Sequence, residues 1–226
     1  MLKINSIFES ISGEAGGFPQ GTWTTFIRLQ GCNLLCRWPC DTPYAQAASD
    51  LHYEMEIPDI MRMVKNEHVL ITGGEPLLQE EMPELIWELL KHGRIVQVET
   101  NGSLPIPAIP VHWVIDRKGP SSGMTGLMRS LEELSTNIEQ VQQCGGNVYL
   151  KWVISDEEDV DYMIEEMNIL LRSFFWNSAL VPFIVSPINA EGNKIIDIIE
   201  RIKEIDYLLL NNIIFSIQLH KIFKMP

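Results

Sequence analysis

The stretch Gly31-Cys32-Asn33-Leu34-Leu35-Cys36-Arg37-Trp38-Pro39-Cys40-Asp41-Thr42 places three cysteines on one short segment, and only Cys144 occurs elsewhere in the chain. An apolar strand pattern over residues 25–30 directly precedes this cysteine loop. The three thiols are therefore expected at the C-terminal end of a strand. Three thiolates so close together indicate a metal site that lacks one protein ligand.

The missing ligand favours iron over zinc. A structural zinc site is normally closed by four protein ligands, whereas an iron–sulfur cluster held by three thiolates leaves one iron open. The alternatives are scattered reduced cysteines, a disulfide with a spare thiol, and a zinc knuckle completed by a distant histidine. The density of cysteines argues against chance, and the lack of a recognisable leader argues against a disulfide. None of the five histidines lies in a zinc-binding pair pattern.

Length and charge restrict the class of protein. A chain of 226 residues that is 46% hydrophobic can bury one α/β domain, expected over residues 1–226, but is somewhat short for a complete eightfold barrel. The net charge of -13 without clustered Lys and Arg predicts no direct binding to nucleic acid. No apolar run approaches the ~20 residues of a membrane helix. A soluble, cytoplasmic protein is expected.

Strand and helix patterns alternate along the chain. Helices are expected in most of the gaps between strands, for example over residues 79–91 and over residues 156–171, the second with Ser155 as its N-cap. Repeated βα units predict a mostly parallel sheet. The expected strands lie near residues 25–30, 68–72, 94–99, 111–116, 147–154, 180–185 and 213–219.

Unusual polar residues follow several of these strands. Each has a simple explanation by itself, as a turn, a helix cap or a solvated charge. In a parallel βα fold, however, the carboxyl ends of the strands meet at one rim, where reactive groups gather. Their shared position indicates a functional site. The segments are Thr72-Gly73-Gly74-Glu75-Pro76, Glu99-Thr100-Asn101-Gly102, Asp116-Arg117-Lys118-Gly119 and Gln218-Leu219-His220-Lys221.

The cysteine loop, followed by Gly73-Gly74-Glu75-Pro76, resembles the radical S-adenosylmethionine superfamily. Further motifs, in order along most of the chain, resemble the 7-carboxy-7-deazaguanine synthase family within it. These motifs are Ile7-Phe8-Glu9-Ser10-Ile11-Ser12-Gly13-Glu14, Cys40-Asp41-Thr42, Glu99-Thr100-Asn101-Gly102, Lys118 with Pro120-Ser121-Ser122-Gly123, Lys151-Trp152-Val153-Ile154 and Gln218-Leu219-His220-Lys221.

The resemblance implies a partial, modified βα (TIM-like) barrel with mostly parallel strands. It implies a 4Fe–4S cluster, S-adenosyl-L-methionine and Mg2+ as cofactors, a homodimer, and a flavodoxin- or ferredoxin-like electron-donor protein. The implied activity is that of a lyase, which converts the pterin substrate 6-carboxy-5,6,7,8-tetrahydropterin to 7-carboxy-7-deazaguanine with loss of ammonia. This is an early step toward the deazapurines queuosine and archaeosine of transfer RNA. The reaction would begin with a 5'-deoxyadenosyl radical that abstracts hydrogen from the pterin.

The resemblance also implies roles for single residues at the cofactor. Three cysteines would ligate iron: Cys32, Cys36 and Cys40. The backbone of Gly73 and Gly74 would allow close approach of S-adenosylmethionine, and Glu75 would pair with its ammonium group. Trp38 would pack on the adenine, an alternative being an aromatic that covers the surface beside the cluster. The remaining cofactor contacts would come from Asp116, Arg117 and Lys118.

Other residues would bind the substrate. Arg28 would pair with the pterin carboxylate, because an arginine within a buried strand needs a partner. Thr42 would bind Mg2+, which in turn would orient the substrate carboxylate. The remaining expected substrate contacts are Ile11, Ser12, Gly13, Glu14 and Thr72, with His220 and the terminal Pro226 as late contacts.

The chain departs from the family pattern at a few positions. Pro39 gives three residues between the second and third cysteines where two are usual, Ser12 replaces a common glutamine, and Asp116 replaces a frequent serine. Two alternatives therefore remain: a glycyl-radical-enzyme activating protein, which would hold no metal at Thr42, and an inactive iron–sulfur scaffold. Cys144 is expected to be a free thiol near a turn without a role.

Overall fold

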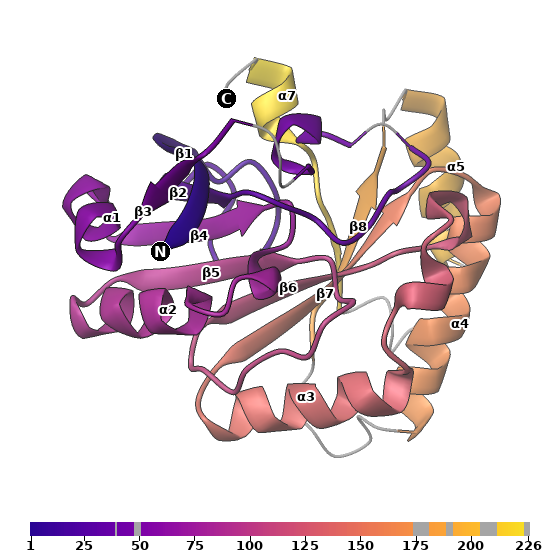
Figure 1. Ribbon diagram of the computed structural model, residues 1–226. Helices are drawn as coiled ribbons and strands as arrows, with labels where there is room; N and C mark the ends of the chain where they lie inside the picture. Colours follow the sequence, from indigo (N-terminus) through magenta and orange to yellow (C-terminus); the bar gives the residue numbers. More distant parts are fainter. Residues whose placement is uncertain (39, 48–50, 174–180, 189–191, 204–211, 224–226) are drawn as a thin grey trace.

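A computed structural model describes residues 1–38, 40–47, 51–173, 181–188, 192–203 and 212–223. Within these residues the strands form one sheet in the order β3-β1-β2-β4-β5-β6-β7-β8-β9 (Figure 1). Strand β1 is antiparallel to β2 and β3, and all other pairs are parallel. The sheet is unclosed, with β3 and β9 at its edges. The strands are β1 (Leu2–Ile11), β2 (Trp23–Leu29), β3 (Tyr53–Met55), β4 (His68–Gly73), β5 (Ile95–Thr100), β6 (His112–Arg117), β7 (Asn147–Ile154), β8 (Phe183–Pro187) and β9 (Ile213–Phe215).

Helices lie around the outside of the curved sheet (Figure 1). The described α-helices are α1 (Ile57–Met63), α2 (Met82–Lys91), α3 (Leu131–Gln143), α4 (Glu157–Ser173), α5 (Gly192–Lys203) and α7 (Leu219–Phe223). Short 3-10 turns occur at η1 (Pro43–Ala45), η2 (Pro76–Leu78), η3 (Pro120–Ser122) and η4 (Thr125–Leu127).

Alternate residues of each parallel strand point to opposite faces of the sheet, so each strand has side chains on an outer side and on an inner side. On the outer side, Val69, Ile71, Trp113 and Trp152 pack in one continuous core with apolar residues of α2, α3 and α4. Each of these strand residues is fully buried. Complete burial of such a side chain contributes about 1.5–3 kcal/mol, so this core fixes the strands that carry the site.

Helix α3 shows how the sequence specifies an outer helix. Ser130 accepts a hydrogen bond from the backbone N–H of Glu133, whose side chain accepts from the backbone of Ser130, so a capping box starts the helix. Leu134, Ile138 and Val141 follow at spacings of four and three residues, and all three are buried. The helix therefore presents one apolar stripe to the sheet.

The inner side of the sheet is partly filled by the loop that joins β1 to β2. Ala15 of this loop packs with Val114 and Ile184 of the inner face. The buried ring of Phe18 packs edge-on against His112, with ring centres 6.0 Å apart. This loop leaves the C-terminal ends of the strands uncovered, and the polar side chains gather there.

All seven expected strands are found, although residue 180 lies outside the described residues. The last strand ends at Phe215, earlier than expected, because Ser216 accepts a hydrogen bond from the backbone of Ala15 and the chain then enters α7. Strands β1 and β3 are not among the expected strands. Polar residues such as Ser6 and Glu9 interrupt the apolar alternation of β1, and β3 is too short for a pattern.

The two expected helices correspond to α2 and α4, with one correction. The N-terminus of α4 is not capped by Ser155. Instead, Asp156 accepts a hydrogen bond of 3.1 Å from the backbone N–H of Asp159. Within the described residues, none of the helices combines the length and the apolar character needed to cross a membrane.

Candidate active site

One cavity of about 250 Å³ opens at the C-terminal ends of the parallel strands. Its wall contains one polar inner-face residue from each of six strands. Because side chains alternate along a strand, the residue two positions earlier in each of these six strands also faces inward. In most of the six strands this earlier residue is less polar than the wall residue. The polar wall residues are Arg28 of β2, Thr72 of β4, Glu99 of β5, Asp116 of β6, Lys151 of β7 and Ser186 of β8.

The three clustered cysteines line this cavity as free, half-buried thiols. The side-chain amide of Asn101 lies 3.8 Å from Cys32 Sγ, and the backbone N–H of Thr42 points to Cys40 Sγ at 3.4 Å. Burial raises the pKa of the Cys32 and Cys36 thiols. Their thiolates therefore need a cationic partner, and a bound iron cluster would be one. Among the described residues, no three Cys, His, Asp or Glu side chains converge on the position of a single metal ion.

The cysteine loop is held by backbone hydrogen bonds at both ends. Cys32 N–H donates to the carbonyl of Gln46 over 2.8 Å, and Arg37 N–H donates to the carbonyl of Ser122 over 2.9 Å. These bonds connect the loop to η1 and to the segment after β6. The cysteines are therefore fixed in position by the surrounding fold, although Pro39 between them lies outside the described residues.

Gly73 and Gly74 allow the end of β4 to pass close to β2. A Cβ atom on Gly73, which has a φ of +145°, would lie 2.2 Å from the carbonyl oxygen of Leu29. A Cβ atom on Gly74 would lie 2.1 Å from the carbonyl oxygen of Gly31. Both glycines line the cavity, and they are required by this close backbone contact.

Glu75 does not fit its expected role as the partner of an ammonium group. Its carboxylate is fully buried and does not line the cavity. It accepts hydrogen bonds from Thr100 Oγ1 at 2.8 Å, from the backbone N–H of Asn101 at 2.6 Å and from that of Leu77 at 2.9 Å. Burial raises the pKa of Glu75, although these hydrogen bonds oppose it. Glu75 therefore joins the loops after β4 and β5.

Arg117 does not fit its expected contact with the cofactor. It follows Asp116 in β6 and so points to the opposite face of the sheet. There it is ion-paired with the buried Glu166 of α4, which also accepts hydrogen bonds from Trp152 Nε1 at 2.9 Å and from the hydroxyl of Tyr162 at 2.6 Å. Burial by itself lowers the pKa of Arg117, but the carboxylate outweighs it and the pKa is raised. Arg117 is a structural residue.

Loss of the Glu166 carboxylate is expected to destabilise the protein strongly. Substitution Glu166→Ala leaves Arg117 buried without a counter-charge, and breaking a buried ion pair in this way costs about 3–5 kcal/mol. Urea denaturation should show this loss in the free energy of unfolding. Glu165→Ala, which removes an exposed neighbour on the same helix, serves as the control and should change stability by less than about 0.5 kcal/mol. Equal stability of the two variants would contradict this role.

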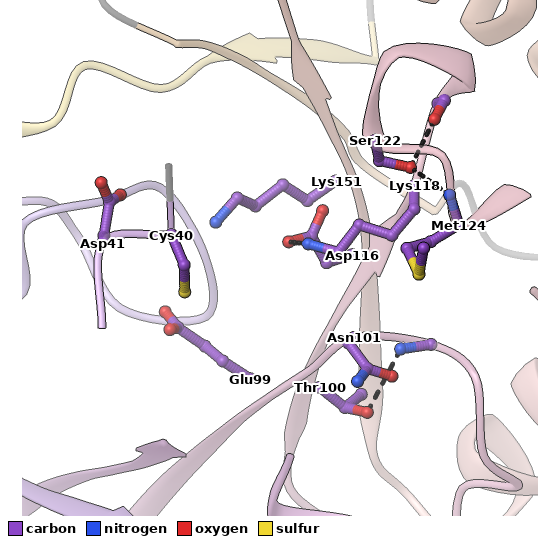
Figure 2. A network of polar contacts seen from close by, with 12 residues as sticks. Cys40, Asp41, Glu99, Thr100, Asn101, Asp116, Lys118, Ser122, Met124 and Lys151 are labelled. Carbon is purple, nitrogen blue, oxygen red and sulfur yellow. Dashed lines mark hydrogen bonds and ion pairs between the residues drawn. The ribbon is translucent and has the colours of Figure 1, made fainter. Parts of the chain in front are cut away.

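A network of charged groups occupies the centre of the cavity wall. Figure 2 shows Lys151, Asp116 and Glu99 directed toward the same space beside Cys40. Lys151 is ion-paired with Glu14. Burial disfavours the ammonium of Lys151, but the carboxylates of Glu14, Asp116 and Glu99 together raise its pKa above the ordinary value. The surrounding carboxylates therefore favour the positively charged form of Lys151.

The pKa values of Glu99 and Lys118 are both raised in this network, for different reasons. Burial raises the pKa of Glu99, although Lys151 opposes it. Its oxygens accept hydrogen bonds from Thr72 Oγ1 at 3.2 Å and from Gln97 Nε2 at 3.3 Å. Lys118 donates to Asp116 at 2.7 Å, and this carboxylate keeps the pKa of Lys118 raised despite burial. Glu99 is thus a wall residue whose carboxyl group has a raised pKa.

Arg28 lies on the inner face with an aromatic environment. Its Nη1 donates to the hydroxyl of Tyr44 over 2.7 Å, and its guanidinium carbon lies 4.9 Å from the centre of the Phe8 ring. Among the described residues, its buried Nε has no hydrogen-bond partner. Burial lowers the pKa of Arg28. An anionic group entering the cavity would supply the missing partner.

The N-terminal segment reaches the cavity only in part. Ile11, Gly13 and Glu14 line it, whereas Ser12 does not. Ser12 is buried with its backbone hydrogen-bonded to Thr22 and Gly21, and its hydroxyl lies 3.4 Å from the carbonyl oxygen of Glu14. The expected substrate contact of Ser12 is therefore replaced by a role in holding the loop that carries Glu14.

The remaining expected residues lie as follows. Trp38 lines the cavity, and the ammonium of Lys118 lies 5.7 Å from its ring centre. Thr42 lines the cavity and its hydroxyl is 3.4 Å from the carbonyl oxygen of Gly73. His220 lies in α7, but its side chain is outside the described residues, as is all of Pro226. Their expected substrate contacts stay predictions.

Several cavity residues were not assigned from the sequence, although most lie in motifs already noted. Lys151 and Glu99 are inner-face strand residues, and a count of alternate positions toward the strand ends would have selected them. Gln218 lies after β9, and its side-chain amide donates to Glu14 at 2.8 Å and to Asp41 at 3.3 Å. No local pattern predicts these contacts, because they join distant parts of the chain.

The comparisons with known proteins agree with this geometry. A family model described as the Radical SAM superfamily matches residues 26–110. The chain is 37% identical over 165 residues to the 7-carboxy-7-deazaguanine synthase of Methanospirillum hungatei JF-1, and the match covers 71% of this chain and 64% of that relative. This match thus spans slightly less than two thirds of the relative's length.

A second relative matches over nearly its full length. The chain is 30% identical over 238 residues to the 7-carboxy-7-deazaguanine synthase of Clostridium acetobutylicum, and the match covers 99% of this chain and 96% of the relative. Among solved structures, the crystal structure of QueE from Escherichia coli has a TM-score of 0.66 at 23% sequence identity, covering 97% of this chain and 94% of that one. The fold is therefore shared with QueE, and the chain belongs to the 7-carboxy-7-deazaguanine synthase family of the radical SAM superfamily.

Proposed function

We propose that this chain converts 6-carboxy-5,6,7,8-tetrahydropterin to 7-carboxy-7-deazaguanine with loss of ammonia. The product would enter the deazapurine pathway toward queuosine or archaeosine. The observation that carries the proposal is the cavity itself, where three half-buried thiols and a ring of strand-end charges face one space. The similarity to two 7-carboxy-7-deazaguanine synthases supports this activity over that of a glycyl-radical-enzyme activating protein.

The residues at one end of the cavity fit the cofactors. Cys32, Cys36 and Cys40 would hold a 4Fe–4S cluster, since the three half-buried thiols line one cavity and partial burial of Cys32 and Cys36 disfavours their thiolates without positive charge nearby. Trp38, Gly73, Gly74, Asp116 and Lys118 would border S-adenosylmethionine. When both groups are bound, reductive cleavage of the sulfonium supplies a 5'-deoxyadenosyl radical. The protein's part is to bring one C–H bond of the substrate to that radical and to exclude water.

The substrate would be held by other residues of the same cavity wall. Arg28 is half-buried, and its buried Nε has no hydrogen-bond partner among the described residues, so it would pair with the pterin carboxylate. Glu14 is oriented by Lys151 and Gln218 and would accept hydrogen bonds from the amino-pyrimidine N–H groups, with Ile11, Gly13 and Thr72 at its sides. Mg2+ would bind at Thr42 and orient the carboxylate.

The loss of ammonia also needs a proton for the departing amine. Glu99 can hold a proton at its carboxyl group, because burial raises its pKa. It lies on the inner face of β5, within the cavity wall. Glu99 would therefore donate this proton as a general acid. A flavodoxin- or ferredoxin-like protein would supply the electron, and a homodimer is the proposed assembly.

Incubation of anaerobically reconstituted protein with substrate tests the proposal. With dithionite, S-adenosylmethionine, Mg2+ and carboxytetrahydropterin present, we expect a product with the mass and ultraviolet spectrum of 7-carboxy-7-deazaguanine. A reaction without reductant is the control and should give none. An intact cluster and bound S-adenosylmethionine without this product would contradict the proposed substrate.

A further inference from the structure

The turn that follows β6, residues 119–123, lies directly against the cysteine loop. The carbonyl oxygen of Ser122 accepts the hydrogen bond from the backbone N–H of Arg37. Gly123 has a φ of +70°, and a Cβ atom there would lie 2.6 Å from the side-chain Nε of Arg37. Arg37 is located between Cys36 and Cys40 in the sequence, so this turn supports the loop between two of the cysteines.

On its other side the same turn rests on Asp159 of α4. The Asp159 side chain is 1% exposed. Its Oδ1 accepts from the backbone N–H of Ser121 at 3.0 Å, and its Oδ2 accepts from Ser121 Oγ at 2.5 Å. A Cβ atom on Gly119 would lie 2.4 Å from Asp159 Oδ1. The turn thus fits the carboxylate closely enough to exclude a side chain at Gly119.

The turn is also rigid internally. Ser122 Oγ donates to the carbonyl of Gly119 at 2.6 Å and accepts from the backbone N–H of Met124 at 3.0 Å (Figure 2). Because Ser122 fixes the turn from within, a shift at Ser121 would move the carbonyl that holds Arg37. A path of hydrogen bonds therefore runs from Asp159 through the turn to the cysteine loop.

We infer that Asp159 is a positioning residue for the cofactor site. It holds the turn at residues 119–123, and through the Ser122 carbonyl it fixes the cysteine loop between Cys36 and Cys40. The turn also directly follows Lys118, a residue of the cavity wall. This inference rests on the proposed function only in that the cavity is taken to bind an iron–sulfur cluster with S-adenosylmethionine.

Asp159 also contacts the start of α4, and an experiment must separate this contact from its support of the turn at residues 119–123. Its Oδ2 also accepts the backbone N–H of Ser155 at 2.8 Å, just before α4 begins. Loss of this bond would affect only the start of the helix. Substitution Ser121→Ala leaves the contact to Ser155 intact and removes the hydroxyl bond to the turn. Ser121→Ala therefore tests positioning without disturbing the helix start.

Three variants of the full chain test the positioning role of Asp159. They are Asp159→Asn, Ser121→Ala and the matched control Glu158→Gln. Asparagine keeps the shape but has one acceptor oxygen in place of two, so it cannot accept from the backbone N–H groups of Ser121 and Ser155 together, since these donate to different oxygens of Asp159. Glu158 lies in the same helical turn but is exposed. For the reconstituted protein, we expect Asp159→Asn to raise the Kd for S-adenosylmethionine by about tenfold, because hydrogen bonds to charged groups are strong. Ser121→Ala should also raise the Kd for S-adenosylmethionine, and Glu158→Gln should leave this Kd unchanged.

A second measurement needs neither cluster nor substrate. In the protein before reconstitution, alkylation of Cys36 and Cys40 followed by peptide mass spectrometry should be several-fold faster in Asp159→Asn and in Ser121→Ala, compared at a temperature well below the melting temperature of each variant. Wild-type Kd values and wild-type alkylation rates in both variants would overturn the inference. Failure of the wild-type protein to form carboxydeazaguanine, with these differences present, would instead contradict only the proposed substrate.

Discussion

Replacement of Cys36 by alanine is expected to abolish both iron binding and product formation. The three thiolates are all the ligands that the protein would provide to the proposed cluster, one for each of three irons. With only two thiolates, a second iron would have no protein ligand. Iron and sulfide assays after anaerobic reconstitution should fall from about four of each per chain to near background. The yield of carboxydeazaguanine should fall below detection.

The fourth cysteine provides a matched control for this substitution. Cys144 is exposed at the C-terminal end of α3 and does not line the cavity. Cys144→Ala should therefore retain the wild-type iron content and activity. If Cys36→Ala kept a full complement of iron, or if Cys144→Ala lost it, the assignment of the ligands would be wrong.

Substitution Lys151→Met is expected to reduce kcat/KM for the pterin by about 10²- to 10⁴-fold, since removal of one partner from a buried ion pair costs about 3–5 kcal/mol. The side chain is nearly isosteric but carries no charge. Glu14 would lose the cation that orients it, and Glu99 would lose its nearest opposing charge. The pKa of Glu99 should rise, so the pH at which activity falls as this general acid loses its proton should shift upward.

The comparison with Lys151→Arg separates charge from geometry. Arginine keeps the positive charge and should restore a large part of the loss, whereas Lys151→Met should bind S-adenosylmethionine normally. Lys91→Met, which removes an exposed lysine of α2, should behave as the wild type. A Lys151→Met variant with unchanged kcat/KM and an unchanged pH profile would exclude a function for the pair with Glu14.

The sequence contains enough local information to predict the parallel part of the fold. Apolar runs between turn residues are strong signals, and they identify β2 and β4 to β9. Strands β1 and β3 carry a weak signal, because polar residues interrupt the apolar alternation of β1 and because β3, at the edge of the sheet, has only three residues. Strand β1 pairs with β2, and β3 pairs with β1, and these pairings depend on contacts that no short window of sequence contains.

The same distinction applies to the site. The cysteine loop and the two glycines form continuous motifs, so the sequence alone predicts that these residues serve one site. Arg117 and Glu75 lie within such motifs but point away from the cavity, because strand alternation and local hydrogen bonds decide the direction of each side chain. Lys151 and Gln218 become relevant only when distant segments come together around Glu14.

The arrangement around Glu14 also explains why an unclosed sheet can form a defined cavity. The backbone N–H of Leu219 donates to the carbonyl of Gly13 at 2.9 Å, and Gln20 Nε2 donates to the carbonyl of Ile217 at 2.6 Å. The segment after β9 is thus fastened to the loop after β1. These contacts join the two sides of the open sheet at the rim where the site lies.

Electron paramagnetic resonance of the reconstituted, dithionite-reduced protein tests the central claim most directly. The account predicts the signal of one reduced 4Fe–4S cluster per chain, and a clear change of its g values when S-adenosylmethionine is added, because the open iron accepts the methionine end of the cofactor. A cluster whose signal is insensitive to S-adenosylmethionine, or reconstituted protein that contains only zinc, would contradict the account.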